Sequence, residues 1–274
     1  MWLQRQKIQG KYSSVLLEEM TKQKSEKLKT KTKGSVVGDG IVVESTSWTF
    51  GEDTPKKFND HVKRSIPFYE EGHSLTAQIS DFFVHSNSVC YELGAATAVL
   101  LRKLAERHKN KQDVRWIGLD REPAMIKQAK AELKNLKNGK KNIELIVDDI
   151  NLHPYEPSDF IVSYYTIQFV PPRLRQKLIN RIYETLNWGG AFVLFEKIRG
   201  PDARFQDLMS AIYTDFKISQ GYNSEEILGK MRSLKGVLEP FSTQGNLDLL
   251  KRAGFVDCAI MFKYNCFEGF LCIK

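Results

Sequence analysis

The strongest constraint on the fold is the regular alternation of short apolar runs with longer segments of helical pattern. Segments with helical spacing cover residues 95–109, 122–138 and 171–187. The apolar runs between and around them are typical of buried strands and cover residues 88–93, 114–119, 142–147, 159–165 and 190–196. Strands that alternate with helices of this length form a parallel sheet covered on both faces. The sequence therefore predicts an α/β fold with a mostly parallel sheet.

Further elements flank this central pattern. Residues 54–84 have helical spacing, and Pro67 predicts a break between two helices there. After the last parallel strand we expect helices at about 202–219, 223–235 and 243–253. The last helix ends at Gly254, a residue typical of helix C-termini. Residues 255–274 predict two strands, which would form an antiparallel hairpin at the sheet edge.

The charge of the chain divides it into two parts. The net charge is +8, of which residues 1–40 carry +5. We therefore interpret residues 1–45 as a basic N-terminal segment, with a helical piece at 13–29 and a linker, and residues 46–274 as the globular domain. The Lys-rich run at 22–34 is typical of a solvated tail, and the alternative is an arm that attracts the phosphates of RNA.

Several protein classes have no support in the sequence. No apolar run approaches the roughly 20 residues of a membrane span, and the N-terminus lacks the apolar core of a secretory signal, which favours a cytoplasmic protein. The four cysteines have no CxxC spacing. Their simplest interpretation is free thiols in a reducing compartment, with no metal site.

Candidate ligand-binding residues follow three successive strands, and ligands of open parallel sheets bind beyond such strand ends. Gly94 follows the first strand and precedes a helix, so it could let a ligand approach the backbone, or it could simply form a turn. Asp120 follows the second strand and could accept from both hydroxyls of a ribose, or cap the next helix. Asp149 and Ile150 follow the third strand and could contact an adenine, or form a turn.

The order of these motifs resembles one family. The chain is similar to the class I S-adenosylmethionine-dependent methyltransferases and, more narrowly, to the bacterial carboxy-S-adenosylmethionine synthases. The similarity extends from Trp48 to Lys274. General motifs of the superfamily are YELG with AAT (91–97), LDREPAMI (119–126), DDI (148–150) and WGGAFVLFEK (188–197). More specific motifs are RSIPFY (64–69) and DFKISQGYNSEEI (215–227). The resemblance implies a Rossmann-like fold with a seven-stranded sheet.

The resemblance also implies roles for individual residues. Tyr69 would lie at the cofactor, although from its sequence context alone it would be a half-buried aromatic residue at a helix end. Asp120 would hold the ribose, with Arg121 beside it. Asp149 and Ile150 would flank the adenine. The cofactor would be S-adenosylmethionine or its carboxylated derivative, and the protein would be a homodimer that acts on a small-molecule substrate.

Three departures from the family pattern affect this expectation. The family's glycine-rich turn has four more residues than the turn at Gly94, so the shorter turn should compress the pocket or redirect the helix that follows. The family has an asparagine after the fourth strand, where this chain has Tyr164. The family arginine that pairs with the extra carboxylate corresponds to Met231, with Arg232 one position away. One position on a helix is a rotation of about 100°.

These observations favour a transferase that uses S-adenosylmethionine. A methyltransferase is our leading expectation. The first alternative is a carboxy-S-adenosylmethionine synthase, for which the resemblance implies prephenate as the second substrate and Arg232 as the candidate catalytic residue. Arg232 could equally be a surface arginine of a helix. The second alternative is a non-catalytic binding protein whose shortened turn no longer supports catalysis.

Overall fold

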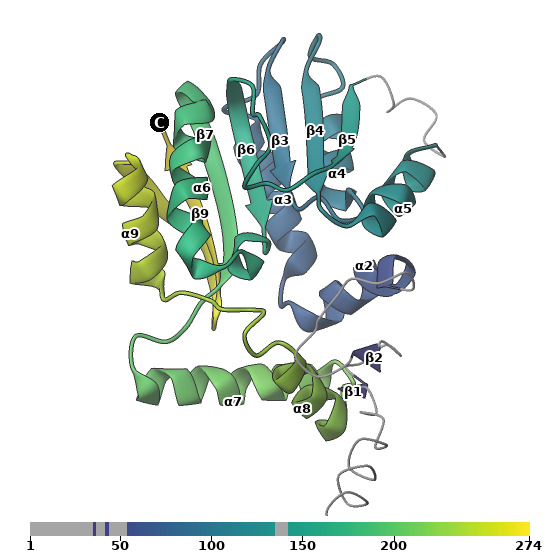
Figure 1. Ribbon diagram of the computed structural model, residues 1–274, viewed down its shortest axis with the longest axis vertical. Coiled ribbons are helices and arrows are strands. Elements are labelled where there is room, and N and C mark those ends of the chain that lie inside the picture. Colours follow the sequence, from purple (N-terminus) through teal and green to yellow (C-terminus); the bar gives the residue numbers. More distant parts are fainter. Residues whose placement is uncertain (1–34, 37–41, 44–53, 135–141) are drawn as a thin grey trace, which may run out of the picture.

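The computed structural model describes residues 35–36, 42–43, 54–134 and 142–274 (Figure 1). Its centre is a seven-stranded sheet with the order β5-β4-β3-β6-β7-β9-β8. The strands β3 (Val89–Leu93), β4 (Arg115–Asp120), β5 (Ile143–Val147), β6 (Ser158–Tyr164) and β7 (Leu186–Lys197) are parallel. The strands β8 (Asp257–Tyr264) and β9 (Phe267–Ile273) add the antiparallel edge. The predicted parallel sheet and its C-terminal hairpin are confirmed.

Helices cover both faces of the sheet. The helices α3 (Tyr69–Ser80), α4 (Val99–Arg107) and α5 (Pro123–Lys134) bury one face, where Leu101, Trp116 and Phe160 are central. The helices α6 (Pro172–Thr185) and α9 (Thr243–Ala253) bury the other face around Phe192 and Phe255. The 3-10 helix η1 (Ile167–Phe169) connects β6 to α6. Because both faces are buried, the central strands are largely apolar.

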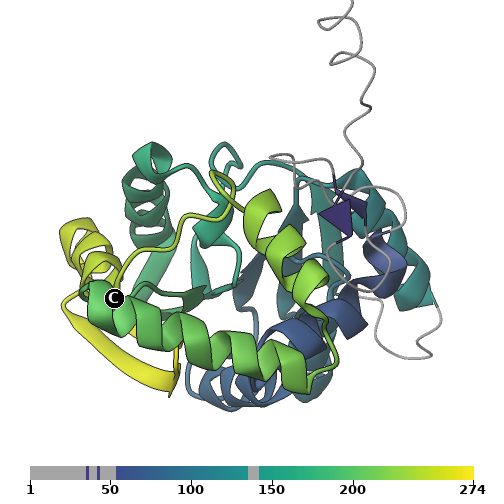
Figure 2. The ribbon, with the colours of Figure 1, turned by 90° about the horizontal axis from the view of Figure 1, so that it is seen from below.

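A third group of helices lies beyond the carboxyl ends of the parallel strands. It contains α2 (Thr54–Ser65), α7 (Ala203–Ser219) and α8 (Ser224–Ser233), below the sheet in Figure 1. The side chain of Asp202 caps α7, and Asn223 with Glu226 forms a capping box on α8. These helices cover the edge of the sheet at which the candidate ligand-binding residues end (Figure 2).

Two short strands precede this domain. β1 (Ser35–Val36) pairs with β2 (Val42–Val43), and β1 packs against α8. The segment expected as a linker before residue 46 thus contains a hairpin that contacts the domain. The predicted helical piece at 13–29 and the Lys-rich run at 22–34 lie outside the described residues.

Two predicted boundaries differ from the structure, and both differences arise in turns. The helix expected from residue 95 begins at Val99, because Gly94 to Ala98 form a tight turn in which three residues have positive φ. The strand expected from residue 190 begins at Leu186, because Leu186 already pairs with Ser158 of β6. The break predicted at Pro67 separates α2 from α3 as expected. The left-handed φ of Gly254 (119°) ends α9.

Candidate active site

The turn after β3 is tied tightly to the neighbouring strand. Gly94 has a φ of 76°, and the backbone N–H groups of Gly94 and Ala95 both donate to the carbonyl oxygen of Leu119, at 2.8 and 2.9 Å. A Cβ atom at position 94 would lie 2.3 Å from Oγ1 of Thr166. Gly94 is therefore required both by the left-handed backbone and by the close approach of Thr166. The turn leaves little space above the end of β3.

Asp120 closes this turn from the end of β4. Its Oδ2 atom accepts a hydrogen bond from the backbone N–H of Ala96 at 2.8 Å, and its Oδ1 atom accepts from the N–H of Glu122 at 2.9 Å. Burial raises the pKa of the Asp120 carboxyl, while the two amide hydrogen bonds oppose this shift. Each carboxylate oxygen thus accepts one hydrogen bond from the backbone, in the position where the sequence predicts contacts to a ribose.

The residues expected to contact the adenine, Asp149 and Ile150, follow the adjacent strand β5. The backbone N–H of Asp148 donates to the carbonyl oxygen of Asp120 at 3.1 Å, which joins the end of β5 to that of β4. Asp149 accepts from the N–H and the side-chain amide of Asn151 through its Oδ1 atom, at 2.8 and 2.7 Å. Ile150 is buried, whereas Arg121 is exposed and pairs with Glu122. Asp149 therefore acts as a turn aspartate, and its Oδ2 atom has no hydrogen-bond partner among the described residues.

An aromatic cluster forms the opposite side of the site. The hydroxyl of Tyr164 donates to the carbonyl oxygen of Tyr69 at 2.7 Å, and the ring of His73 lies 4.5 Å from the centroid of each tyrosine ring. Burial raises the pKa of both tyrosine hydroxyls and lowers the pKa of His73 to about 3. The two hydroxyls are therefore protonated and the imidazole is neutral at physiological pH. In the described part of the chain, Nε2 of His73 is buried without a hydrogen-bond partner.

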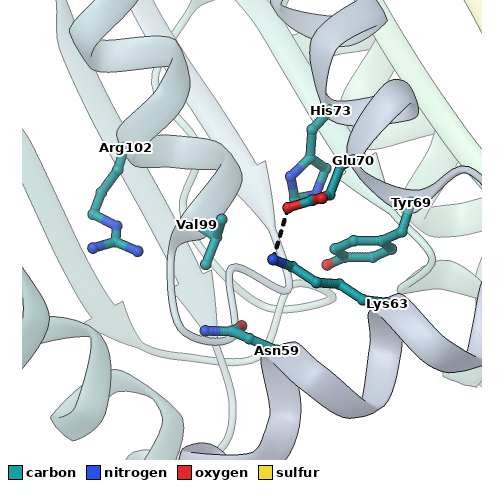
Figure 3. A pocket seen from close by; sticks show the side chains of 7 residues that line it. All are labelled: Asn59, Lys63, Tyr69, Glu70, His73, Val99 and Arg102. Atoms are coloured by element: carbon teal, nitrogen blue, oxygen red, sulfur yellow. Dashed lines mark ion pairs between the residues drawn. The ribbon is translucent and has the colours of Figure 1, made fainter.

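A cavity of about 210 Å³ adjoins this cluster. It lies between α2, α3 and the first turn of α4, and Figure 3 shows its lining side chains. Lys63 pairs with Glu70 at 2.7 Å on one side, and Arg102 pairs with Glu132 at 3.0 Å on the other. The complete lining is Asn59, Lys63, Tyr69, Glu70, His73, Val99 and Arg102. Most of its lining residues carry polar or charged groups, and the cavity is smaller than the roughly 300–1,000 Å³ of most ligand pockets.

Glu92 is a buried acid below the turn. Its Oε2 atom accepts from the backbone N–H of Leu101 in the first turn of α4, at 2.9 Å. Burial raises the pKa of Glu92 to about 8. The carboxyl is therefore mainly protonated at neutral pH, and it fixes the beginning of α4 relative to β3.

The candidate catalytic residue lies elsewhere. Arg232 is exposed on α8 and does not line the cavity, and Met231, which matches the family arginine in the sequence, is 52% exposed. Lys230, one position earlier, points inward instead, and its Nζ atom lies 2.7 Å from Nε2 of His61 and 2.8 Å from Oγ of Ser65.

The site has residue types that suit an adenosyl cofactor, but its conformation does not suit one. The residue types at the strand ends are suitable, because two acids and a buried isoleucine lie at the ends of adjacent strands. The conformation is not suitable, because the amide of Ala96 occupies Asp120, Thr166 covers Gly94 and the cavity is small. In this conformation the turn from Gly94 to Ala98 lies directly against Asp120.

Sequence reasoning did not select several of these residues. His73 and Lys63 are isolated polar residues in segments with a helical pattern, so no motif marks them, whereas Thr166 begins the stretch TIQFV (166–170), which also matches the family. Glu92 had a detectable signal, because it is a single acid inside an apolar strand pattern. Buried acids of this kind are either paired or functional.

Comparisons with known proteins agree with this architecture. Residues 91–190 match the family model described as "Methyltransferase domain". The structure of human N-acetylserotonin methyltransferase in complex with SAM is similar, with a TM-score of 0.56 at 17% identity, covering 82% of this chain and 56% of that one. A putative S-adenosyl-L-methionine-dependent methyltransferase from Methanococcus maripaludis has a TM-score of 0.53 at 17% identity, covering 83% of this chain and 95% of that one. The fold is that of the class I S-adenosylmethionine-dependent methyltransferases.

More similar relatives define the family within this class. The carboxy-S-adenosyl-L-methionine synthase of Staphylococcus epidermidis is 36% identical over 228 residues, which cover 83% of this chain and 97% of the relative. The synthase of Nautilia profundicola is 36% identical over 225 residues, covering 82% and 94%. The chain belongs to the carboxy-S-adenosyl-L-methionine synthase family, and it is an S-adenosylmethionine-dependent transferase.

In the described residues, no helix is long and apolar enough to cross a membrane. The same residues contain no cluster of three or more His, Cys, Asp or Glu side chains that could hold a metal ion.

Proposed function

We propose that this protein is a carboxy-S-adenosyl-L-methionine synthase that transfers a carboxyl group from prephenate to S-adenosylmethionine. The observation that carries the proposal is the extent of the similarity. The chain matches 97% of the length of a relative with that name, far beyond the methyltransferase domain at residues 91–190. The segments outside this domain include α3 on one face of the sheet, and α2, α7 and α8, which cover its carboxyl edge.

In this proposal each end of the site has its own task. Asp120 accepts the ribose hydroxyls once the turn has moved, with Arg121 beside it, and Asp149 and Ile150 contact the adenine. Tyr69, Tyr164 and the turn at Gly94 enclose the reacting end of the cofactor. In carboxyl transfer, the methyl carbon of S-adenosylmethionine would take up the carboxyl group and lose a proton, and prephenate would lose hydroxide, so that water and the decarboxylated donor leave. The adjacent sulfonium would make this methyl group acidic, and the task of the enzyme is to position the two substrates and exclude bulk water.

Calorimetric titration of the mass-verified protein, followed by product analysis, tests the proposal. We expect S-adenosylmethionine to bind and its carboxylated derivative to bind at least tenfold more tightly. Incubation with S-adenosylmethionine and prephenate should yield a product about 44 Da heavier than S-adenosylmethionine. This difference is the mass of CO2, as expected for carboxylation. Equal affinity for both compounds, with no product, would contradict the synthase function.

Methyl transfer to another small-molecule acceptor is the second candidate function. The exposure of Arg232 and Met231 on α8 favours it, because no arginine of α8 lines the cavity in the described structure. Binding of S-adenosylmethionine with no preference for the carboxylated form would support this candidate. Binding of neither compound would instead support a non-catalytic role, since the bond between Ala96 and Asp120 would then be permanent.

The assembly and location of the protein are also proposals. The family resemblance supports a homodimer in the cytoplasm, and light scattering of the purified protein together with cell fractionation would test both. RNA binding through the Lys-rich run at 22–34 has weaker support, because the charge of the remaining chain is small. Deletion of residues 1–34 should abolish any salt-dependent RNA binding and leave cofactor affinity unchanged.

A further inference from the structure

Two lysine side chains share one aromatic ring between the sheet and α7. Lys197 is the last residue of β7, and its Nζ atom lies 4.2 Å from the centroid of the Tyr213 ring. Lys217, one turn further along α7 than Tyr213, has its Nζ atom 4.6 Å from the same centroid. Both ammonium groups are thus held against one ring by cation–π contacts.

The packing around Tyr213 fixes this arrangement. Lys197 lies directly opposite Phe267 in the β7–β9 register, and the Phe267 ring is 5.2 Å from that of Tyr213. The hydroxyl of Tyr213 donates to the carbonyl oxygen of Ser65 at 2.8 Å, which connects α7 to the end of α2. The two lysines are therefore positioned by the sheet and by a buried hydrogen bond.

Neither lysine has an anionic partner. Lys217 is only 8% exposed, and in the described part of the chain neither Nζ atom has a carboxylate or another hydrogen-bond acceptor. Burial lowers the pKa of Lys197, and it lowers the pKa of Lys217 to about 8. The neighbouring thiol of Cys266 does not compensate, because burial raises its pKa. Ammonium groups that are largely removed from solvent are normally paired with an anion, and the described residues supply none to this pair.

The pair lies at the edge of the sheet that carries the candidate active site. A row of aromatic rings connects the two places. Successive centroids are 5.2 Å apart from Tyr213 to Phe267, 5.8 Å to Tyr165, 4.8 Å to Tyr164 and 5.2 Å to Tyr69. The acid that precedes Lys197, Glu196, bonds the backbone N–H of Gln168 and so belongs to a different cluster. An anion bound at the lysines would adjoin the same aromatic wall as the cofactor.

We propose that Lys197 and Lys217 form the binding site for a carboxylate of the donor substrate, a role that rests on the proposed synthase function. Each ammonium group supplies N–H donors and a positive charge, and a carboxylate has lone pairs on both oxygens that accept such donors. Anchoring the donor through a charged group also supplies binding energy that positions its other end for reaction. In this proposal, residues of β7 and α7 bind the carboxylate of the donor substrate, and Arg232 takes no part in binding it.

Lysine-to-methionine variants test the site with little loss of packing, because methionine keeps most of the apolar stem. In calorimetry we expect Lys197→Met and Lys217→Met each to weaken prephenate binding at least tenfold, and the double variant to abolish it. Binding of S-adenosylmethionine should change less than twofold in all three. Lys251→Met is the matched control, because Lys251 is an exposed lysine on α9. Unchanged prephenate affinity in the double variant would overturn the proposal.

A second measurement keeps the test valid if the variants are unstable. In the wild-type protein with 13C-methylated lysines, addition of prephenate should raise the pKa of Lys217, because a bound carboxylate favours the charged form. An unchanged titration in the presence of saturating prephenate would contradict the site. Failure of the lysine site can be distinguished from failure of the synthase function. If prephenate binding depends on the lysines but no carboxylated product forms, the site is retained and the synthase function is rejected. Product formation with an unchanged KM for prephenate in the double variant would reject the site alone.

Discussion

The backbone N–H of Ala96 donates to Oδ2 of Asp120 at 2.8 Å. This bond joins the turn after β3 to the acid that the sequence predicts as the ribose ligand. Ala96 itself has a φ of 46°, and Ala98 has a φ of 57°, so the turn places two alanines in the left-handed region. Such conformations cost about 1 kcal/mol or more each for a non-glycine residue. The turn is thus strained and is held in place by Asp120, the residue that we propose to bind the ribose.

Lengthening the turn should strengthen cofactor binding. Insertion of Cys-Ser-Leu-Gly after Gly94 restores the length of the family's turn and frees Asp120 from Ala96. Since a hydrogen bond to a charged group contributes about 1.5–3 kcal/mol, we expect the affinity for S-adenosylmethionine to rise about tenfold or more in calorimetry. The same insertion combined with Asp120→Asn is the control and should lose most of the gain. An insertion that leaves the affinity unchanged would contradict this account.

Gly94→Ala should destabilise the fold by more than about 2 kcal/mol in urea unfolding. An alanine at this position would have to adopt a left-handed backbone conformation, and its Cβ atom would lie 2.3 Å from Oγ1 of Thr166. Thr166→Ala in the same chain removes the nearest contact but not the backbone strain, so it should recover part of the loss. Full additivity of the two substitutions would show that Thr166 does not cover Gly94.

Glu92 should make the folded state less stable as the pH rises. Its pKa is raised by burial to about 8, above the value of about 4.5 expected in the unfolded chain. Between these values the folded state binds one more proton, so the unfolding free energy falls by up to about 1.4 kcal/mol per pH unit. This contribution is complete below pH 4.5 and is lost by about pH 8.

The variant Glu92→Gln should remove this slope, as measured by chemical unfolding at pH 5, 6, 7 and 8. Glu196, whose pKa is also raised by burial to about 8, provides the comparison, because Glu196→Gln should remove a second and independent slope. A parallel pH dependence in the wild type and Glu92→Gln would show that Glu92 is ionised in the folded protein.

Removal of the Tyr164 hydroxyl should destabilise the aromatic cluster modestly. Tyr164→Phe deletes a buried donor 2.7 Å from the carbonyl oxygen of Tyr69, and we expect a loss of about 1–2 kcal/mol in thermal or urea unfolding. Tyr183→Phe is a suitable control, because in the described residues the Tyr183 hydroxyl donates no hydrogen bond. Its ring contacts Phe255, Gly254 and the ammonium group of Lys274, and phenylalanine keeps the ring. Equal effects of the two variants would argue against the bond.

The sequence by itself determined the sheet and the place of the site. The alternating pattern predicts the parallel strands, and their carboxyl ends bring Gly94, Asp120 and Asp149 to one edge, because adjacent parallel strands end side by side. Local chemistry also determined the ends of several helices, such as the turn at Gly254. These features depend on residues close in the chain.

Only the tertiary structure decided which groups those residues meet. Asp120 bonds Ala96, 24 positions away, and Tyr164 bonds Tyr69, 95 positions away. Lys197 and Lys217 share the ring of Tyr213 because the register of β7 and β9 fixes one lysine and the rotation of α7 fixes the other. Such contacts follow from the packing of whole elements, and side-chain orientation at that level is not encoded in any local pattern.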